Sequence, residues 1–257
     1  MTTFLFDSIV FGPVRSRRLG VSLGINLLPV NSKICSFDCI YCECGWTDRK
    51  EKGRLPSRKE VRTFLEEKLQ SMQFKGDTLD VITYAGNGEP TLHPDFAGII
   101  DDSIELRNKY FPWARIAVLS NSTMLDKPQV VAALKKVDQN ILKLDSAFDS
   151  TIKLLNQPRV KFSAEELVKN LKSFEGNLII QTLFLKGNFE GRTIDNTTEV
   201  EVSSWIDLLR VIKPKEVMVY TIARDTPAQG LEKVSLKELK AIAAKVKELG
   251  IPVQVSA

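Results

Sequence analysis

Apolar runs typical of β-strands alternate with segments of helical period along most of the chain, and this alternation constrains the fold more than any other feature. Strands that are separated by helices pair in parallel, and right-handed crossovers wind them into a curved sheet. An α/β fold is therefore expected. The runs interpreted as strands are 20–28, 79–85, 115–120, 140–145, 178–185, 216–222 and 252–255.

Three of the expected helices begin with a capping box, in which a Ser caps the backbone and a Glu three residues later bonds back to it. No flexible linker or low-complexity segment interrupts the chain. We expect residues 1–257 to form a single domain, a partial, open TIM-like barrel of about six βα units with parallel strands. Its functional face should lie at the carboxyl ends of the strands. The capping pairs are Ser57 with Glu60, Ser163 with Glu166, and Ser235 with Glu238.

All four cysteines, Cys35, Cys39, Cys42 and Cys44, follow the first expected strand at its carboxyl end. Three thiolates leave one iron of a cubane iron–sulfur cluster without a protein ligand, and that open position can bind another molecule. The alternative is a structural zinc site that uses Cys44 as its fourth ligand. Zinc modules usually pair two well-separated Cys-x2-Cys knuckles, so the single short loop favours a cluster. Cys44 is then expected to be a free thiol, because a fourth thiolate would close the open position.

The grouping of the cysteines also bears on the compartment. A secreted domain that depends on disulfides spreads its cysteines along the chain to close loops. The sequence shows no secretory signal pattern and no apolar run that approaches the about 20 residues needed to span a bilayer. We expect a cytoplasmic protein that does not enter membranes.

The formal net charge of +4 arises near the amino end of the chain, because residues 1–60 contain ten Lys or Arg against six Asp or Glu. A basic patch around the cysteine loop could steer a phosphate-bearing or nucleic-acid substrate. Asp48 and Glu51 interrupt the second part of the patch, and a solvated loop is the alternative. The basic residues are Arg15, Arg17, Arg18, Arg49, Lys50, Lys52 and Arg54.

The run ICSFDCIYC, with Tyr41 before its last cysteine, resembles the hallmark of the radical S-adenosylmethionine (SAM) enzymes. The resemblance implies that Cys35, Cys39 and Cys42 hold a 4Fe-4S cluster whose open iron chelates SAM, with Tyr41 as a SAM contact. It further implies that an electron delivered to the cluster cleaves SAM to methionine and a 5′-deoxyadenosyl radical, which abstracts hydrogen from a substrate. The protein must then position the substrate and exclude water and oxygen.

A second motif, Gly86-Asn87-Gly88-Glu89-Pro90-Thr91, follows the second expected strand. Glycine permits close backbone approach, and a carboxylate accepts hydrogen bonds from an ammonium group. The motif resembles the Gly-Gly-Glu-Pro turn by which radical SAM enzymes hold the amino group of SAM. Gly88, Glu89 and Pro90 match that turn directly, and Asn87 replaces a glycine.

Polar residues at the ends of later strands resemble further SAM contacts of the same family. Lys143 stands where relatives carry a serine, in a segment that contacts the ribose of SAM. The alternative for each residue is that it lines the barrel mouth without touching a ligand. The candidate residues are Asn121, Asp145, Ser146, Gln181 and Tyr220.

The amino-terminal run GPVRSRRLG, residues 12–20, looks like the signature of Fe-S oxidoreductases related to the wyosine-forming tRNA-modifying radical SAM enzymes. The resemblance makes a tRNA nucleoside a candidate substrate, although the chain carries no appended RNA-binding domain. A small molecule or a peptide is the other substrate class.

Because no cysteine remains for a second cluster, a low-potential electron donor such as flavodoxin or ferredoxin is implied. A hypothesis from another class is a non-catalytic metal-binding module for nucleic acid or electron transfer. That module would not bind SAM, and it would leave the Gly-Glu-Pro turn without a role.

Overall fold

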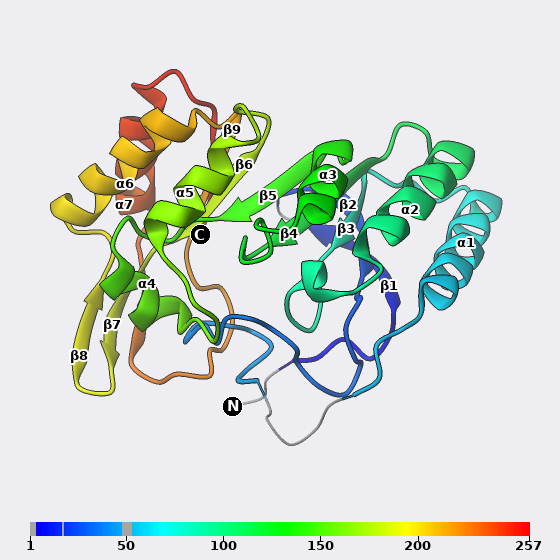
Figure 1. The fold of residues 1–257 in the computed structure, drawn as a ribbon, viewed down its shortest axis with the longest axis horizontal. Coiled ribbons are helices and arrows are strands. Elements are labelled where there is room, and N and C mark those ends of the chain that lie inside the picture. The colour runs from blue at the N-terminus through cyan, green and yellow to red at the C-terminus, as the bar shows by residue number, and fades with distance from the viewer. Residues whose placement is uncertain (1–3, 17, 48–52) are drawn as a thin grey trace.

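The main sheet of the computed structural model curves into a half-barrel (Figure 1). The structure describes residues 4–16, 18–47 and 53–257. Within them the sheet has eight strands in the order β1-β2-β3-β4-β5-β6-β9-β11, and every neighbouring pair is parallel except β1 with β2. The bounds are β1 Val10–Ser16, β2 Gly20–Ile25, β3 Val81–Tyr84, β4 Arg115–Ser120, β5 Gln139–Lys143, β6 Ile179–Leu183, β9 Glu216–Tyr220 and β11 Val253–Ser256.

Helices cover the outer face of the curved sheet, with α1 to α3 over one half and α5 to α7 over the other (Figure 1). The capping boxes at Ser57 and Ser235 are both present. At Ser163 only half of the expected capping box forms: Ser163 accepts from the Glu166 amide, and the Glu166 side chain does not bond back to it. The helices are α1 Arg58–Lys75, α2 Phe96–Tyr110, α3 Pro128–Lys136, α4 Asp149–Asn156, α5 Ala164–Lys172, α6 Glu199–Ile212 and α7 Leu236–Lys247, with a short 3-10 helix η1 at Pro90–Leu92.

The inner face of the half-barrel is apolar at its floor and polar at its mouth. A buried layer at the floor gathers Leu19, Val81, Ala117, Ile141, Ile179 and Met218. Because side chains alternate between the two faces of a strand, the residue two positions later lies on the same face. In four strands that next residue, Leu119, Lys143, Gln181 or Tyr220, lines a cavity at the carboxyl end of the sheet.

Two parts of the fold differ from the sequence-based expectation of parallel strands alone. Strand β1 pairs antiparallel with β2, and its register shifts between Phe11 and Val14, where Gly12 and Pro13 break the apolar alternation. Strands β7 and β8 follow β6 and form a separate antiparallel sheet with β10, which comes after β9, in the order β10-β7-β8. The expected strand 178–185 therefore divides into β6 and the start of β7. The strands of the separate sheet are β7 Leu185–Phe189, β8 Arg192–Asp195 and β10 Leu231–Lys233.

The first expected strand also ends earlier than its apolar run. Leu27 and Leu28 are buried although they lie beyond the last residue of β2. Burial, rather than pairing in the sheet, accounts for their apolar character. Among the described helices, none is long and apolar enough to cross a membrane.

Candidate functional site

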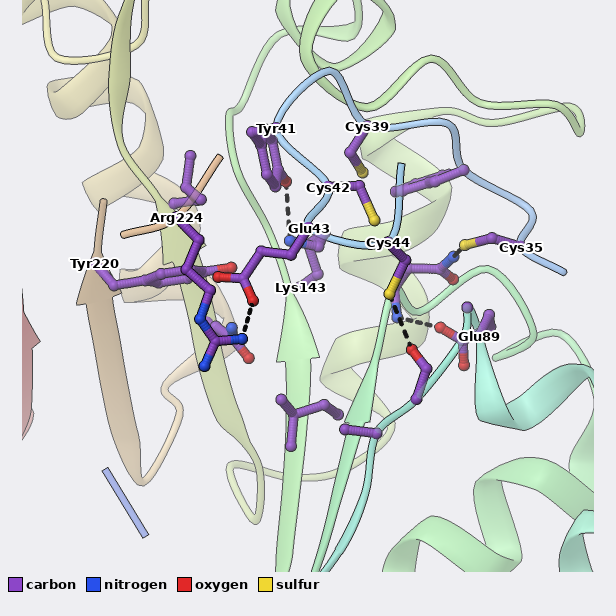
Figure 2. A pocket seen from close by; sticks show the side chains of 18 of the residues that line it. Cys35, Cys39, Tyr41, Cys42, Glu43, Cys44, Glu89, Lys143, Tyr220 and Arg224 are labelled. Carbon is purple, nitrogen blue, oxygen red and sulfur yellow. Dashed lines mark hydrogen bonds and ion pairs between the residues drawn. The ribbon is translucent and has the colours of Figure 1, made fainter. Parts of the chain in front are cut away.

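A cavity of about 360 Å³ opens at the carboxyl ends of the parallel strands (Figure 2). The cysteine loop that follows β2 forms one side of the cavity, and the ends of β3 to β6 and β9 form the rest. Cys35, Cys39 and Cys42 all line it. The topology therefore brings the cysteine loop to the polar end of the half-barrel, where the sequence predicts the functional face.

The cysteine loop is attached to the glycine turn after β3 by backbone contacts. The Ile34 amide donates to the Asn87 carbonyl oxygen at 3.0 Å, and the Glu89 amide donates to the Ile34 carbonyl oxygen at 3.1 Å. Gly88 has a φ of +134°, and a Cβ atom at this position would lie 1.9 Å from the Ile34 carbonyl oxygen. Because only glycine fits this approach, the two sequence motifs form a single structural unit.

Two asparagine side chains contact cysteine sulfurs from opposite ends of the loop. Asn121, directly after β4, lies with its Nδ2 at 3.5 Å from the Cys35 Sγ. Asn156, at the end of α4, lies with its Nδ2 at 3.4 Å from the Cys39 Sγ. The backbone holds this end of the loop as well, because the Ile40 amide donates to the Leu155 carbonyl oxygen at 3.0 Å. Both amides therefore supply N–H groups to the expected ligands.

Lys33 supplies a buried positive charge beside the cysteines. Its Nζ donates to the Gly45 carbonyl oxygen at 2.7 Å, and only 3% of the residue is exposed. Burial alone would lower the pKa of Lys33, but the negative charges that Cys42, Cys35 and Cys39 can carry outweigh burial and raise it. Lys33 therefore stays protonated and stabilises negative charge on the sulfurs.

The cysteines differ in the ease with which they lose a proton. Burial raises the pKa of Cys35 to about 12 and also raises the pKa of Cys39. A hydrogen bond from the Cys44 thiol, followed by the charge of Lys33, lowers the pKa of Cys42 to about 5 despite its burial. Buried thiols of high pKa become thiolates when they bind a metal, since the metal displaces the proton.

This donor set fits an iron–sulfur cluster. Three sulfurs face one cavity, with a buried cation and two N–H donors around them, which suits an anionic cluster held by thiolates. A zinc ion with Zn–S bonds of about 2.3 Å needs its sulfurs about 3.8 Å apart. Within the described ranges, no three Cys, His, Asp or Glu side chains lie close enough to hold one ion.

The fourth cysteine, Cys44, has two acceptors for its thiol proton. One is Cys42, and the other is the Gly86 carbonyl oxygen, which lies 3.4 Å from the Cys44 Sγ.

The Glu89 carboxylate is buried and already accepts several hydrogen bonds. It accepts from the Asn121 amide at 2.6 Å and from the Ser120 hydroxyl at 2.9 Å. Thr91 donates to it from its amide at 3.1 Å and from its hydroxyl at 2.5 Å. Burial raises the pKa of Glu89 in spite of these donors. The donors fix the orientation of the carboxylate at the cavity wall between β3 and β4.

A second network orients Tyr41 and Lys143 on another wall. The Tyr41 hydroxyl donates to Asp145, and the Lys143 Nζ lies 2.9 Å from the Tyr41 hydroxyl and 3.3 Å from the Asp145 Oδ2. Asn156 Nδ2 donates to the same carboxylate oxygen at 2.8 Å. Burial alone would lower the pKa of Lys143, but the negative charges that Asp145, Tyr220 and Cys39 can carry together outweigh burial and raise it. The network therefore presents a permanent cation to the cavity.

The structure gathers most of the candidate SAM contacts around this cavity, but not all of them. Asp145 and Ser146 are almost fully buried outside it, and Ser146 donates to the Glu201 Oε2 at 2.7 Å. Pro90 is buried at the start of η1. These three residues support the wall from behind. The candidates that line the cavity are Tyr41, Gly88, Glu89, Asn121, Gln181 and Tyr220.

Sequence reasoning missed Lys33 and Asn156 as parts of the site. Lys33 precedes the cysteine motif without a recognisable pattern, and Asn156 lies 117 positions from the cysteine that it contacts. Of the basic patch, Arg15 is exposed and Arg54 pairs with Glu60. Arg18 lines the cavity. The other charged residues of that patch, Arg17, Asp48, Arg49, Lys50, Glu51 and Lys52, lie outside the described residues.

Comparison with known proteins agrees with this geometry. The family model of the radical SAM superfamily matches residues 32–192. A UPF0026 protein of Synechocystis is 32% identical over 86% of this chain and 77% of its own length. A protein of Brachyspira hyodysenteriae named GTPase Obg is 29% identical over 90% of this chain, which spans only 32% of that protein.

Solved structures share the fold at low sequence identity. A radical SAM methyltransferase from Sphaerobacter thermophilus superposes with a TM-score of 0.68 at 15% identity, covering 91% of this chain and 65% of the other. SuiB of Streptococcus suis bound to SAM superposes with a TM-score of 0.64 at 16% identity, and the match covers 90% of this chain and 50% of SuiB. Archaeal TYW1 superposes with a TM-score of 0.52 at 13% identity, and the match covers 88% of this chain and 71% of TYW1. The expected partial barrel is confirmed, and the chain belongs to the radical SAM superfamily, in which it groups with the UPF0026 proteins.

Proposed function

We propose that this protein is a radical SAM enzyme in which Cys35, Cys39 and Cys42 hold a 4Fe-4S cluster. The observation that carries the proposal is that these three cysteines line one cavity together with Gly88 and Glu89 of the SAM-binding motif. When bound, the cluster and SAM supply the reductive cleavage that yields methionine and a 5′-deoxyadenosyl radical able to abstract hydrogen from a substrate. Residues 1–257 act as one radical SAM core.

The chain's own residues stabilise and orient these groups. Lys33 offsets the negative charge of the thiolates, and Asn121 and Asn156 donate N–H bonds toward their sulfurs. Such contacts favour the electron-rich state of a cluster. Cys44 stays a free thiol beside Gly86.

The wall formed by Gly86, Gly88 and Glu89 would hold the methionine part of SAM. Among the described residues, Glu89 Oε2 accepts a hydrogen bond only from the Asn121 backbone amide, so this oxygen retains capacity for an ammonium group. Tyr41, Gln181 and Tyr220 line the remainder of the cavity and would contact the rest of SAM or the substrate. Pro90, Asp145 and Ser146 would act by supporting these walls.

The reaction needs an electron from outside the chain. All four cysteines lie in one loop, so the sequence has none left for a second cluster. We therefore propose a low-potential donor such as flavodoxin or ferredoxin as the partner.

A tRNA nucleoside is one candidate substrate. The fold-level likeness to TYW1, a wyosine-forming enzyme, and the arginines in the sequence run 12–20 favour it. Incubation of the reduced enzyme with SAM and unmodified tRNA, followed by mass spectrometry of the nucleosides, would reveal a mass shift if tRNA is the substrate. Unchanged nucleosides in all tRNAs would remove this candidate.

The test of the enzyme class is anaerobic reconstitution, reduction with dithionite in the presence of SAM, and chromatography for 5′-deoxyadenosine. We expect the wild type to form it and Cys39→Ala to lose both the cluster and the product. Full SAM cleavage by Cys39→Ala would contradict the proposal. A bound zinc ion with intact SAM would favour the non-catalytic metal-binding module.

A further inference from the structure

Arg18 and Leu19, which precede β2, lie beneath the cavity and are fixed there. Leu19, 6% exposed, packs into the apolar floor of the half-barrel. The Leu19 carbonyl oxygen accepts from the Arg115 Nη2 at 3.1 Å, and the Arg18 carbonyl oxygen accepts from the Gln254 Nε2 at 3.1 Å. Hydrogen bonds from strands β4 and β11 therefore fix the backbone at Arg18 and Leu19, and this fixes the point from which the Arg18 side chain extends.

The side chain of Arg18 lines the cavity and lies against an aromatic ring. Its guanidinium carbon stands 4.9 Å from the centroid of the Tyr220 ring. Contact with an aromatic face orients the guanidinium plane and stabilises its charge without using its N–H groups. The donors of Arg18 therefore remain available to an acceptor.

No such acceptor is present among the described residues. The Arg18 Nη1 is buried and has no hydrogen-bond partner, and no described acid forms an ion pair with this guanidinium. A buried, charged N–H group without a partner is unfavourable and rare in folded proteins. The arrangement is therefore incomplete without an anion.

The other described cations of the cavity are compensated. Lys33 bonds to the Gly45 carbonyl oxygen, Lys143 pairs with Asp145, and Arg224 pairs with Glu43 at 2.8 Å. Figure 2 shows the Arg224–Glu43 pair on the Tyr220 side of the pocket. Arg18 thus differs from every other described cation that lines the cavity.

The position of Arg18 separates it from the wall proposed to hold the methionine part of SAM. Tyr220 and Glu89 lie on opposite sides of the pocket, with Lys143 between them (Figure 2). Because Arg18 rests on the Tyr220 ring, it faces the cavity from the side opposite Glu89. A ligand group at Arg18 would therefore belong to the second reactant rather than to the amino acid part of SAM.

We propose that Arg18 binds an oxyanion of the substrate, a carboxylate or a phosphate, and so makes this enzyme selective for acidic substrates. This inference rests on the proposed function of the same cavity. The flat fork of guanidinium N–H groups matches both oxyanions, and the Tyr220 ring sets its plane.

The test is calorimetric titration of the anaerobically reconstituted protein, saturated with SAM, with inorganic phosphate and, separately, with acetate. We expect one site for at least one of these anions, and the tighter of the two identifies the class. Arg18→Gln should weaken binding by about tenfold or more, and Arg18→Lys by less, because lysine keeps the charge without the fork. Arg15→Gln, on the exposed part of the same hairpin, is the matched control and should bind like the wild type.

Three results would overturn the inference. The wild type could bind neither anion at 20 mM, Arg18→Gln and Arg18→Lys could both bind like the wild type, or anions could bind only when SAM is absent. The last result would assign Arg18 to SAM itself. Iron content and 5′-deoxyadenosine formation are measured on the same wild-type sample. A sample that cleaves SAM but binds no anion contradicts this inference alone, whereas one without a cluster contradicts the proposed function.

Discussion

Gly88 and Ile34 approach so closely that a single Cβ atom would separate the two halves of the site. An ideal Cβ on Gly88 would lie 1.9 Å from the Ile34 carbonyl oxygen, which itself accepts from the Glu89 amide. This contact attaches the cysteine loop to the proposed SAM wall. The spacing between the cluster and SAM should therefore depend on it.

Gly88→Ala should destabilise the fold by several kcal/mol, because backbone must move to relieve the overlap. The variant should also bind less iron on reconstitution. The control is Gly76→Ala, at a glycine that also has a positive φ, +70°, but has no atom within 4 Å of the added Cβ. Gly76→Ala should lower the free energy of unfolding by about 1 kcal/mol. Urea unfolding and iron analysis of both variants check the prediction, and equal losses would contradict it.

Asn156 should govern how firmly the cluster is held, because its amide lies between the Cys39 sulfur and the Asp145 carboxylate. In Asn156→Asp a carboxylate would replace the N–H donor and repel both partners. We expect the rate of iron loss to a chelator to rise by about 10- to 100-fold. Asn170→Asp on α5, which introduces the same charge away from the cysteines, should lose iron at the wild-type rate. Equal rates in the two variants would show that Asn156 does not support the ligand.

Lys33→Met should lower the reduction potential of the cluster, because the buried ammonium stabilises the added electron. A charge at about 6 Å and an effective dielectric constant of about 20 contributes about 3 kcal/mol, on the order of 100 mV for one electron. A redox titration followed by electron paramagnetic resonance (EPR) measures the shift. The control is Lys136→Met, which removes a half-exposed lysine paired with Asp101 on the outer helices. An unchanged or higher potential in Lys33→Met would contradict the assigned role.

Asp102 should stabilise the packing of α1 against α2 in a pH-dependent way. Hydrogen bonds from Arg58, and then from Arg62, lower the pKa of Asp102 in the folded protein. A lowered pKa stabilises the fold above the unfolded value of about 3.9, and the contribution disappears as pH falls through the folded value. Because both arginines are partly exposed, Asp102→Asn should cost only about 1 kcal/mol at pH 7.

The difference in unfolding free energy between wild type and Asp102→Asn should therefore shrink as pH is lowered toward 3. Urea unfolding of the cluster-free protein at several pH values measures it. Asp101→Asn, at a half-exposed position one residue earlier, serves as the control. If the difference in unfolding free energy instead grew toward acid pH, the stabilising role assigned to ionised Asp102 would be wrong.

Sequence patterns predict those strands and helix caps of this protein that are determined by residues close together in the chain. The strand 115–120 coincides with β4, and the caps at Ser57 and Ser235 hold because spacing within one turn determines them. Strand β1 was missed because Gly12 and Pro13 obscure its alternation, although pairing with β2 is enough to form it. Tertiary pairing thus overrides a weak local signal.

The same distinction applies to the candidate site: its contiguous motifs could be predicted from the sequence, and its long-range contacts could not. The cysteines and the turn at Gly88 are recognisable because their spacing is contiguous. The contact of Asn156 with Cys39 depends on where α4 ends in space. The stacking of Arg18 on Tyr220 likewise joins the first hairpin to a late strand. No pattern along the chain could have indicated either contact.

The most direct measurement of the central claim, an open iron held by Cys35, Cys39 and Cys42, is the EPR spectrum of the reduced, reconstituted protein with and without SAM. The account predicts a 4Fe-4S signal whose shape changes when SAM is added, because SAM binds the iron that lacks a protein ligand. Cys44→Ser should behave in the same way. A cluster signal that SAM leaves unchanged, or a signal lost in Cys44→Ser, would contradict the claim.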